Sequence, residues 1–173
     1  QNGDAGGYGA GNAGAVRGGM VNASVRGGYA PSGNAIANSV EMSGGGAVEL
    51  YGGRSGANAR NNAIHISGGT VKGEIYGGMA GLEAGGNTVT IDGGALGVAV
   101  YAGYGAVVAY NKVVINNNPN LSGTSLRGAN SGAEWMTGNA LEINGKNVKA
   151  KEVANFQSYV FNLPHGMDIN ADK

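Results

Sequence analysis

Leu50-Tyr51-Gly52-Gly53 is one copy of a tetrapeptide that recurs along this chain of 173 residues. The copies begin 25 residues apart and share an aliphatic residue, then a larger residue, then two small ones. They are Val25-Arg26-Gly27-Gly28, Leu50-Tyr51-Gly52-Gly53, Ile75-Tyr76-Gly77-Gly78 and Val100-Tyr101-Ala102-Gly103, with Leu126-Arg127-Gly128-Ala129 following after 26. A repeat of this length is typical of solenoid proteins, whose units bury their apolar side chains only against neighbouring units.

A second repeated signature consists of an asparagine followed by two apolar residues separated by one other residue. Its copies are Asn38-Ser39-Val40-Glu41-Met42, Asn62-Ala63-Ile64-His65-Ile66, Asn87-Thr88-Val89-Thr90-Ile91, Asn111-Lys112-Val113-Val114-Ile115 and Asn139-Ala140-Leu141-Glu142-Ile143. Apolar residues alternate at period two in both signatures, which predicts short strands. Glycine and asparagine bound each run and predict sharp corners, because both residues tolerate positive φ values.

Short strands joined by corners in a 25-residue unit predict an all-β fold. We expect a right-handed parallel β-helix, or β-solenoid, of about six coils with roughly 25 residues each, in which equivalent residues of successive coils lie over one another. We assign residues 1–150 to the solenoid repeats. Residues 151–173 are expected to form a closing strand and the start of a following segment, because bulkier residues gather there.

The asparagines that open the second signature form one predicted column. Stacked amides can hydrogen-bond along the axis of the rod, as they do in cross-β assemblies. We therefore predict a structural asparagine ladder made of Asn38, Asn62, Asn87, Asn111 and Asn139.

Tyr51, Tyr76 and Tyr101 form a second predicted column, with Arg26 and Arg127 at its two ends. The preceding residue of each faces the core, so alternation places the rings on the outside. Offset stacking with flanking cation–π contacts is one interpretation of this column. An exposed, ligand-facing aromatic ladder that binds a sugar or a protein is the other.

Composition excludes several classes of function. Eleven basic and eleven acidic residues leave no net charge, so we expect no nucleic-acid binding. The chain has no cysteine and no apolar run near the roughly 20 residues of a membrane helix, so we expect neither disulfides nor membrane insertion. Asp92 precedes Gly93-Gly94 rather than following them, which argues against calcium-binding repeats.

One group of residues has the types needed for catalysis. Glu41 and His65 take the same outward position on adjacent coils, and Ser67 lies two residues beyond His65. Ser67 and His65 would stand about 6.5–7 Å apart on an extended strand, without a turn to bind an oxyanion. The aspartates are scattered, and Glu49 and Glu74 are explained as a charge ladder on a solvated face. We therefore predict no catalytic residues, no metal site, no cofactor and no enzymatic activity.

The two signatures resemble the passenger regions of Gram-negative autotransporters, which are glycine-rich β-helical surface adhesins. The segment from Ile143-Asn144-Gly145-Lys146 to Leu163-Pro164 is similar to the part that follows the repeats in those proteins. The resemblance covers about residues 16–164. It implies a protein exposed on the bacterial cell surface or secreted, exported through a C-terminal outer-membrane barrel.

The expected function is that of a non-enzymatic stalk or adhesin segment that mediates adhesion or acts as a rigid spacer. Its partners would be a host-cell protein, a glycan or neighbouring passengers with which it self-associates. The alternatives are a polysaccharide-acting β-helix enzyme and a glycan-binding segment of a phage tail fibre.

Overall fold

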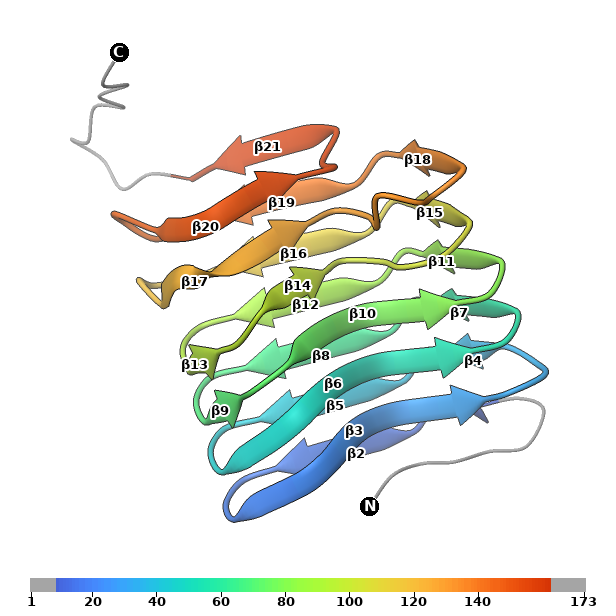
Figure 1. Ribbon diagram of the computed structural model, residues 1–173, viewed down its shortest axis with the longest axis horizontal. Helices are drawn as coiled ribbons and strands as arrows, with labels where there is room; N and C mark the ends of the chain where they lie inside the picture. Colours follow the sequence, from blue (N-terminus) through green and yellow to red (C-terminus); the bar gives the residue numbers. More distant parts are fainter. Residues whose placement is uncertain (1–8, 163–173) are drawn as a thin grey trace.

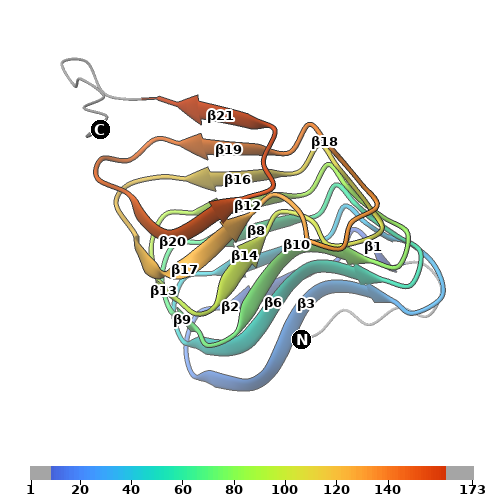
Figure 2. The ribbon, with the colours of Figure 1, turned by 45° about the horizontal axis from the view of Figure 1, so that its top comes forward.

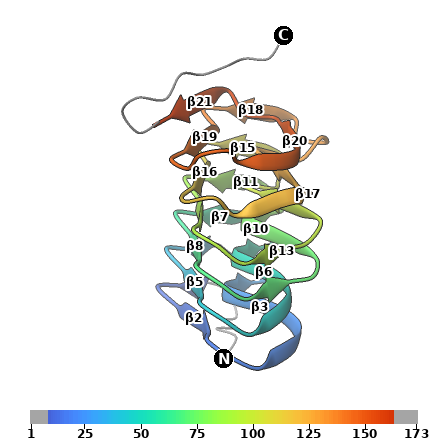
Figure 3. The ribbon, with the colours of Figure 1, turned by 90° about the vertical axis from the view of Figure 1, so that its left-hand side faces the viewer.

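The chain winds into a right-handed parallel β-helix, as the repeat predicts (Figure 1). The computed structural model describes residues 9–162, which form strands β1 to β21 and no helix. There are about six turns of roughly 25 residues. Seen from the side, the coils stack from β2 and β3 at one end to β20 and β21 at the other (Figure 3).

Three parallel sheets run along the rod, one for each side of the coil, and we call them sheets I, II and III. Sheet I contains β1 (Gly9–Ala10), β4 (Ala35–Ile36), β7 (Asn58–Arg60), β11 (Glu83–Gly85), β15 (Val107–Ala109) and β18 (Trp135–Thr137). Sheet II contains β3 (Met20–Ala30), β6 (Gly46–Ser55), β9 (Thr70–Val71), β10 (Glu74–Ala80), β13 (Ala95–Leu96), β14 (Ala99–Tyr101), β17 (Asn120–Arg127) and β20 (Lys149–Ala154). Sheet III contains β2 (Ala13–Val16), β5 (Ser39–Met42), β8 (Ala63–Ile66), β12 (Thr88–Ile91), β16 (Lys112–Ile115), β19 (Ala140–Ile143) and β21 (Ser158–Phe161).

Strand register places each repeat position over itself. Ile75 of β10 pairs with Leu50 of β6 on one side and with Val100 of β14 on the other. On sheet III, Ile91 pairs with Ile66 and with Ile115 in the same way. The predicted stacking of equivalent side chains is confirmed.

The core is a thin column of aliphatic side chains enclosed by the three sheets. Leu50, Ile66, Ile75 and Ile91 are completely buried and belong to one continuous hydrophobic cluster. Burying each such side chain contributes roughly 1.5–3 kcal/mol, so a few per coil suffice. The low aliphatic content of the sequence therefore suits a narrow interior.

The predicted asparagines lie buried at the corner where sheet I gives way to sheet III. The Nδ2 of Asn62 donates to the Oδ1 of Asn87 at 2.9 Å and to the backbone oxygen of Ala35 at 3.1 Å. The backbone N–H of Asn62 donates to the same Oδ1 at 3.0 Å. We call the whole column the amide ladder; it runs through Asn12, Asn38, Asn62, Asn87, Asn111, Asn139 and Gln157.

The second glycine of the tetrapeptide makes room for the amide ladder. A Cβ atom at Gly78 would lie 2.5 Å from the Nδ2 of Asn87, and one at Gly53 would lie 2.6 Å from that of Asn62. The two signatures, nine residues apart in these coils, are therefore two halves of one packing contact.

The last coil is shorter than the others. Gln157 receives the amide hydrogen bonds of Asn139 after only 18 residues, because the chain passes from β20 to β21 without a strand in sheet I. The boundary predicted at residue 150 falls inside β20, and β21 pairs in parallel with β19. Residues 151–162 thus extend sheets II and III. Leu163-Pro164, at the end of the segment predicted to follow the repeats, lies outside the described residues.

We expect Asn87→Ala to lower the free energy of unfolding by about 3–5 kcal/mol, measured by urea denaturation. The substitution removes four hydrogen bonds made by the Asn87 side chain. The groups that formed these bonds are buried, so water cannot replace the lost partner. Asn118→Ala, which changes an exposed asparagine, serves as the control and should alter stability by less than about 0.5 kcal/mol. Equal losses in the two variants would contradict a stabilising role for the amide ladder.

Candidate functional site

Two clusters of polar and aromatic side chains lie outside the core. The first, which we call the histidine row, consists of Glu41, His65 and Asp92 on sheet III. The second, which we call the elbow cluster, consists of tyrosines and arginines on the outer side of sheet II. It contains Arg26, Tyr29, Tyr51, Arg54, Tyr76, Tyr101 and Tyr104.

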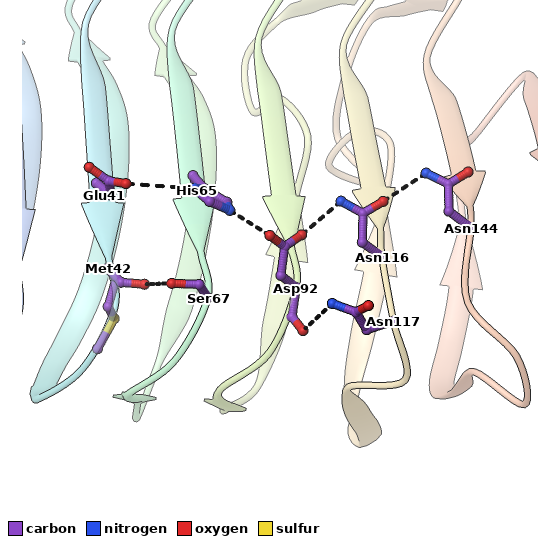
Figure 4. Close-up of polar contacts among 8 residues, drawn as sticks. All are labelled: Glu41, Met42, His65, Ser67, Asp92, Asn116, Asn117 and Asn144. Carbon is purple, nitrogen blue, oxygen red and sulfur yellow. Dashed lines mark hydrogen bonds and ion pairs between the residues drawn. The ribbon is translucent and has the colours of Figure 1, made fainter.

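The histidine row crosses three successive coils (Figure 4). Glu41 and His65 are direct partners in the β5–β8 pairing, and Asp92 directly follows β12. The Nε2 of His65 lies 2.7 Å from the Oδ2 of Asp92, and its Nδ1 lies 3.8 Å from the Oε1 of Glu41. A cationic imidazole would therefore sit between two carboxylates.

Amide side chains extend this row toward the C-terminus. Asn116 donates to the Oδ1 of Asp92 at 2.7 Å, and Asn144 donates to Asn116 at 2.7 Å (Figure 4). Asn162 donates to Asn144 at 2.8 Å. The hydrogen bond from His65, followed by that from Asn116, lowers the pKa of Asp92 below its usual range.

The predicted arrangement of Glu41, His65 and Ser67 does not form a catalytic triad. Ser67 directs its hydroxyl to the backbone oxygen of Met42 at 3.5 Å, away from the imidazole (Figure 4). Both ring nitrogens of His65 face carboxylates, so neither is placed to accept the proton of Ser67. Sequence reasoning missed Asp92, because the path of the corner after β12, rather than the strand register, brings it beside His65.

In the elbow cluster, the three predicted tyrosines stack face to face. The rings of Tyr51 and Tyr76 are 4.9 Å apart and inclined by 11°, and those of Tyr76 and Tyr101 are 5.2 Å apart and inclined by 8°. Arg26 lies 5.9 Å from the Tyr51 ring at one end, as expected. At the other end Arg127 instead pairs with Glu152 at 2.6 Å.

A bend in the strands of sheet II brings a second column of side chains onto the tyrosines. Residues three apart face opposite sides of a regular strand, yet the rings of Tyr101 and Tyr104 meet edge to face at 5.6 Å. Strands β3, β6 and β10 curve visibly along their length (Figure 2). The second column contains Tyr29, Arg54, Met79 and Tyr104, as the pairing register shows.

Two of the three stacked tyrosine rings are on the outer side but are not exposed. Tyr51 is 4 % exposed and Tyr76 6 % exposed, because neighbouring rings cover their faces and the bend covers their edges. Tyr101 is partly exposed, so the interpretation of the column as an exposed ladder is wrong for Tyr51 and Tyr76. Sequence reasoning missed the second column, although the repeat could have revealed it. Its members recur every 25 residues, three positions after the larger residue of each tetrapeptide.

Carboxylates bind the phenol groups of this stack. Tyr51 donates its hydroxyl to Glu49 at 3.0 Å, and Tyr76 donates to Glu74 at 2.6 Å. Burial, followed by the hydrogen bond to Glu49, raises the pKa of Tyr51 to about 12. Burial and Glu74 raise the pKa of Tyr76 further. The predicted Glu49/Glu74 ladder thus serves as the acceptor side of the tyrosine stack.

A cavity of about 200 Å³ adjoins the elbow cluster and is lined by Tyr29, Pro31, Arg54, Ser55 and Gly56. Residues 9–162 contain no group of three or more histidine, aspartate or glutamate side chains arranged to hold a metal ion. Over the same residues, no helix has the length and apolar character needed to cross a membrane.

No protein-family model, curated protein sequence or solved structure gives a significant match to this chain.

We expect Asp92→Asn to weaken the pH dependence of stability in acid. Because the folded state lowers the pKa of Asp92, its contribution is present above the ordinary value near 3.9 and is lost as pH falls through the folded value. The difference between wild type and variant should be about 1 kcal/mol or less at pH 7, since the pair is partly exposed, and should shrink as the pH falls below the ordinary pKa. Urea denaturation across this range measures it. Glu41→Gln is the control and should show a smaller effect, and a constant difference at all pH values would exclude the ionic contribution.

We expect Tyr76→Phe to reduce the loss of stability above pH 10. A folded pKa raised above the unfolded value near 10 stabilises the protein below that value, and this stabilisation is lost as pH rises through the folded pKa. Phenolate absorbance should show Tyr51 ionising near pH 12 and Tyr76 only on unfolding. At pH 7 the variant should lose about 1.5 kcal/mol with its bond to Glu74. Tyr110→Phe, at a ring that is 72 % exposed, should change neither property.

Proposed function

We propose that this chain is a non-enzymatic, rigid stalk segment of a bacterial surface protein of the autotransporter passenger type. It would lie on the cell surface or outside the cell and hold an adhesive region away from the membrane. The observation that carries this proposal is the amide ladder, which joins every coil to the next from Asn12 to Gln157.

Stiffness follows from the arrangement of hydrogen bonds. Parallel sheets on three sides join the coils to their neighbours, except that the last coil lacks a strand in sheet I, so bending the rod in any direction would stretch at least one sheet. Each coil adds about 4.8 Å along the axis, so a stalk gains length simply by adding repeats. A part that must span a distance benefits from such a geometry.

The way the fold is stabilised also suits export. The chain has no cysteine, so its stability needs no oxidation step. Each coil contacts only its neighbours, so folding can begin at one end and spread coil by coil as the chain emerges. The resemblance of the repeats to autotransporter passengers, which cross the outer membrane in extended form, supports the same origin.

We expect the chain to be displayed on the cell surface when it is placed between an N-terminal epitope tag and an autotransporter barrel in a Gram-negative host. The tag should react with antibody on intact cells, and the solenoid should resist protease. A variant with both Asn87→Ala and Asn111→Ala should lose protease resistance, while Asn118→Ala should retain it.

Scattering and activity assays on the purified chain complete this test. A compact particle whose scattering curve matches the six-coil solenoid, without turnover of polysaccharides, supports the stalk. A curve typical of an unfolded chain would contradict it, and release of reducing ends from pectin-like polymers would favour the alternative of a polysaccharide-acting enzyme.

A further inference from the structure

We propose that the cavity beside the elbow cluster binds the carboxylated sugar of an acidic glycan, with Arg54 holding the carboxylate. This site is independent of the stalk function, because a rod needs no ligand.

The first observation is the state of Arg54. It lies near the end of β6 and is half-buried. Its guanidinium packs 5.9 Å from the ring of Tyr29 and 5.4 Å from that of Tyr51. Within residues 9–162, no carboxylate lies within 4.0 Å of it and its side chain makes no hydrogen bond.

Two other arginines of the solenoid differ from Arg54. Arg60 pairs with Glu83, and Arg127 pairs with Glu152 on the next coil. Arg54 thus offers five donors at the wall of a cavity, while comparable arginines use theirs on acidic neighbours. A half-buried guanidinium with unused donors favours a bound anion, because its hydration is incomplete.

The cavity is preformed. The Oγ of Ser55 donates to the backbone oxygen of Gly33 at 2.5 Å and accepts the N–H of Ala57 at 2.9 Å. At Gly56 the backbone passes so close to Pro31 that a Cβ atom would lie 1.9 Å from the proline oxygen. These contacts hold the wall in place before any ligand arrives, so binding requires little ordering of the protein.

The lining selects the chemistry of the ligand. A guanidinium binds a planar carboxylate through two parallel hydrogen bonds. Tyr29 and Pro31 add apolar surface beside it, which matches the C–H face of a sugar ring. The volume of about 200 Å³ is below the 300–1,000 Å³ of most ligand pockets, so one sugar unit fits better than a longer segment. The thin stem of an acidic amino acid would leave the apolar wall uncovered.

Along the part of the rod formed by residues 9–162, the site occurs once. In the column that contains Arg54, the next coils carry Met79 and Tyr104, and the preceding coil carries Tyr29. Without a second cation in this column, the cavity would hold a single acidic unit rather than a polymer lying along the axis.

Binding can be tested with the purified chain by saturation-transfer NMR and titration at low salt. The acidic probes are glucuronate, galacturonate and N-acetylneuraminate, and the neutral ones are glucose and galactose. Acetate and inorganic phosphate test for a simple anion site, and N-acetylglutamate amide tests for an acidic peptide. We expect at least one acidic sugar to bind about tenfold or more tightly than the neutral sugars, acetate, phosphate and the glutamate amide.

Variants then assign the site. Arg54→Met should weaken binding of that sugar at least about tenfold, because two hydrogen bonds to a charged group disappear. Arg54→Lys should restore part of it. Arg17→Met, at an exposed arginine just beyond β2, should leave it unchanged. Thermal unfolding of each variant confirms that the fold is kept.

Four results would overturn the proposal. These are no binding of any acidic sugar, equal binding of the neutral sugars, equal binding of acetate, phosphate or the glutamate amide, and unchanged affinity in Arg54→Met. Each leaves the stalk function intact, because display and particle shape are measured separately.

Discussion

The structure depends on one constraint: at the corner between sheets I and III, a backbone N–H turns away from the sheets and must still be bonded. At Asn62, this backbone N–H and the side-chain Nδ2 both donate to the Oδ1 of Asn87 on the next coil. The Nδ2 of Asn87 in turn donates twice, to the backbone oxygen of Ala59 in sheet I and to the Oδ1 of Asn111. Only a primary amide combines two acceptor and two donor sites in so small a volume. Aspartate could not donate and would stack like charges at the strand spacing, and serine has too few donors.

The spacing between successive coils also determines which side chains can lie over one another on the outer surface. Uncharged and charged side chains respond to it differently. Uncharged groups can stack on copies of themselves, as Tyr51, Tyr76 and Tyr101 do. Like charges in one column repel each other, and two outer columns alternate the sign of their charges instead. Glu49 and Glu74 are an exception, and each of them accepts the hydroxyl of a stacked tyrosine. The histidine row places His65 between two carboxylates, and Lys112 pairs with Glu142 on the next coil. Cross-coil ion pairs are thus a consequence of the stacking geometry, and their modest energies add to a fold that the core and the amide ladder already specify.

Periodicity made most of the fold predictable. The spacing of Leu50, Ile75 and Val100 predicts both the coil length and the strand register, because identical positions can satisfy each other only when they are aligned. The asparagine corner follows from the same repeat. Local departures from regular strands were not predictable in this way. Alternation along a straight strand predicts that the rings of Tyr51 and Tyr76 are exposed to solvent. In the structure they are buried, because sheet II bends at the paired glycines and covers them. Asp92 reaches His65 through a corner whose path depends on Gly93 and Gly94, with a positive φ of 94° at Gly94.

A solenoid surrounds each repeat position with nearly the same neighbours, so a distinct site can arise only where the repeat changes. In the column of Tyr29, Arg54, Met79 and Tyr104, each coil carries a different type of side chain from the coil before it. The core column beside it carries only aliphatic residues. Changes in the core are limited by packing, because each side chain contacts copies of its position above and below. Changes on the concave outer face alter charge and shape without disturbing the coil register. Arg54 is such a change: it removes a ring from an aromatic column, leaves a cavity beside the turn at Pro31, and supplies a charge that its own coil does not neutralise. Ligand specificity in this architecture is therefore expected in the irregular positions of an outer column, while the regular ones maintain the rod.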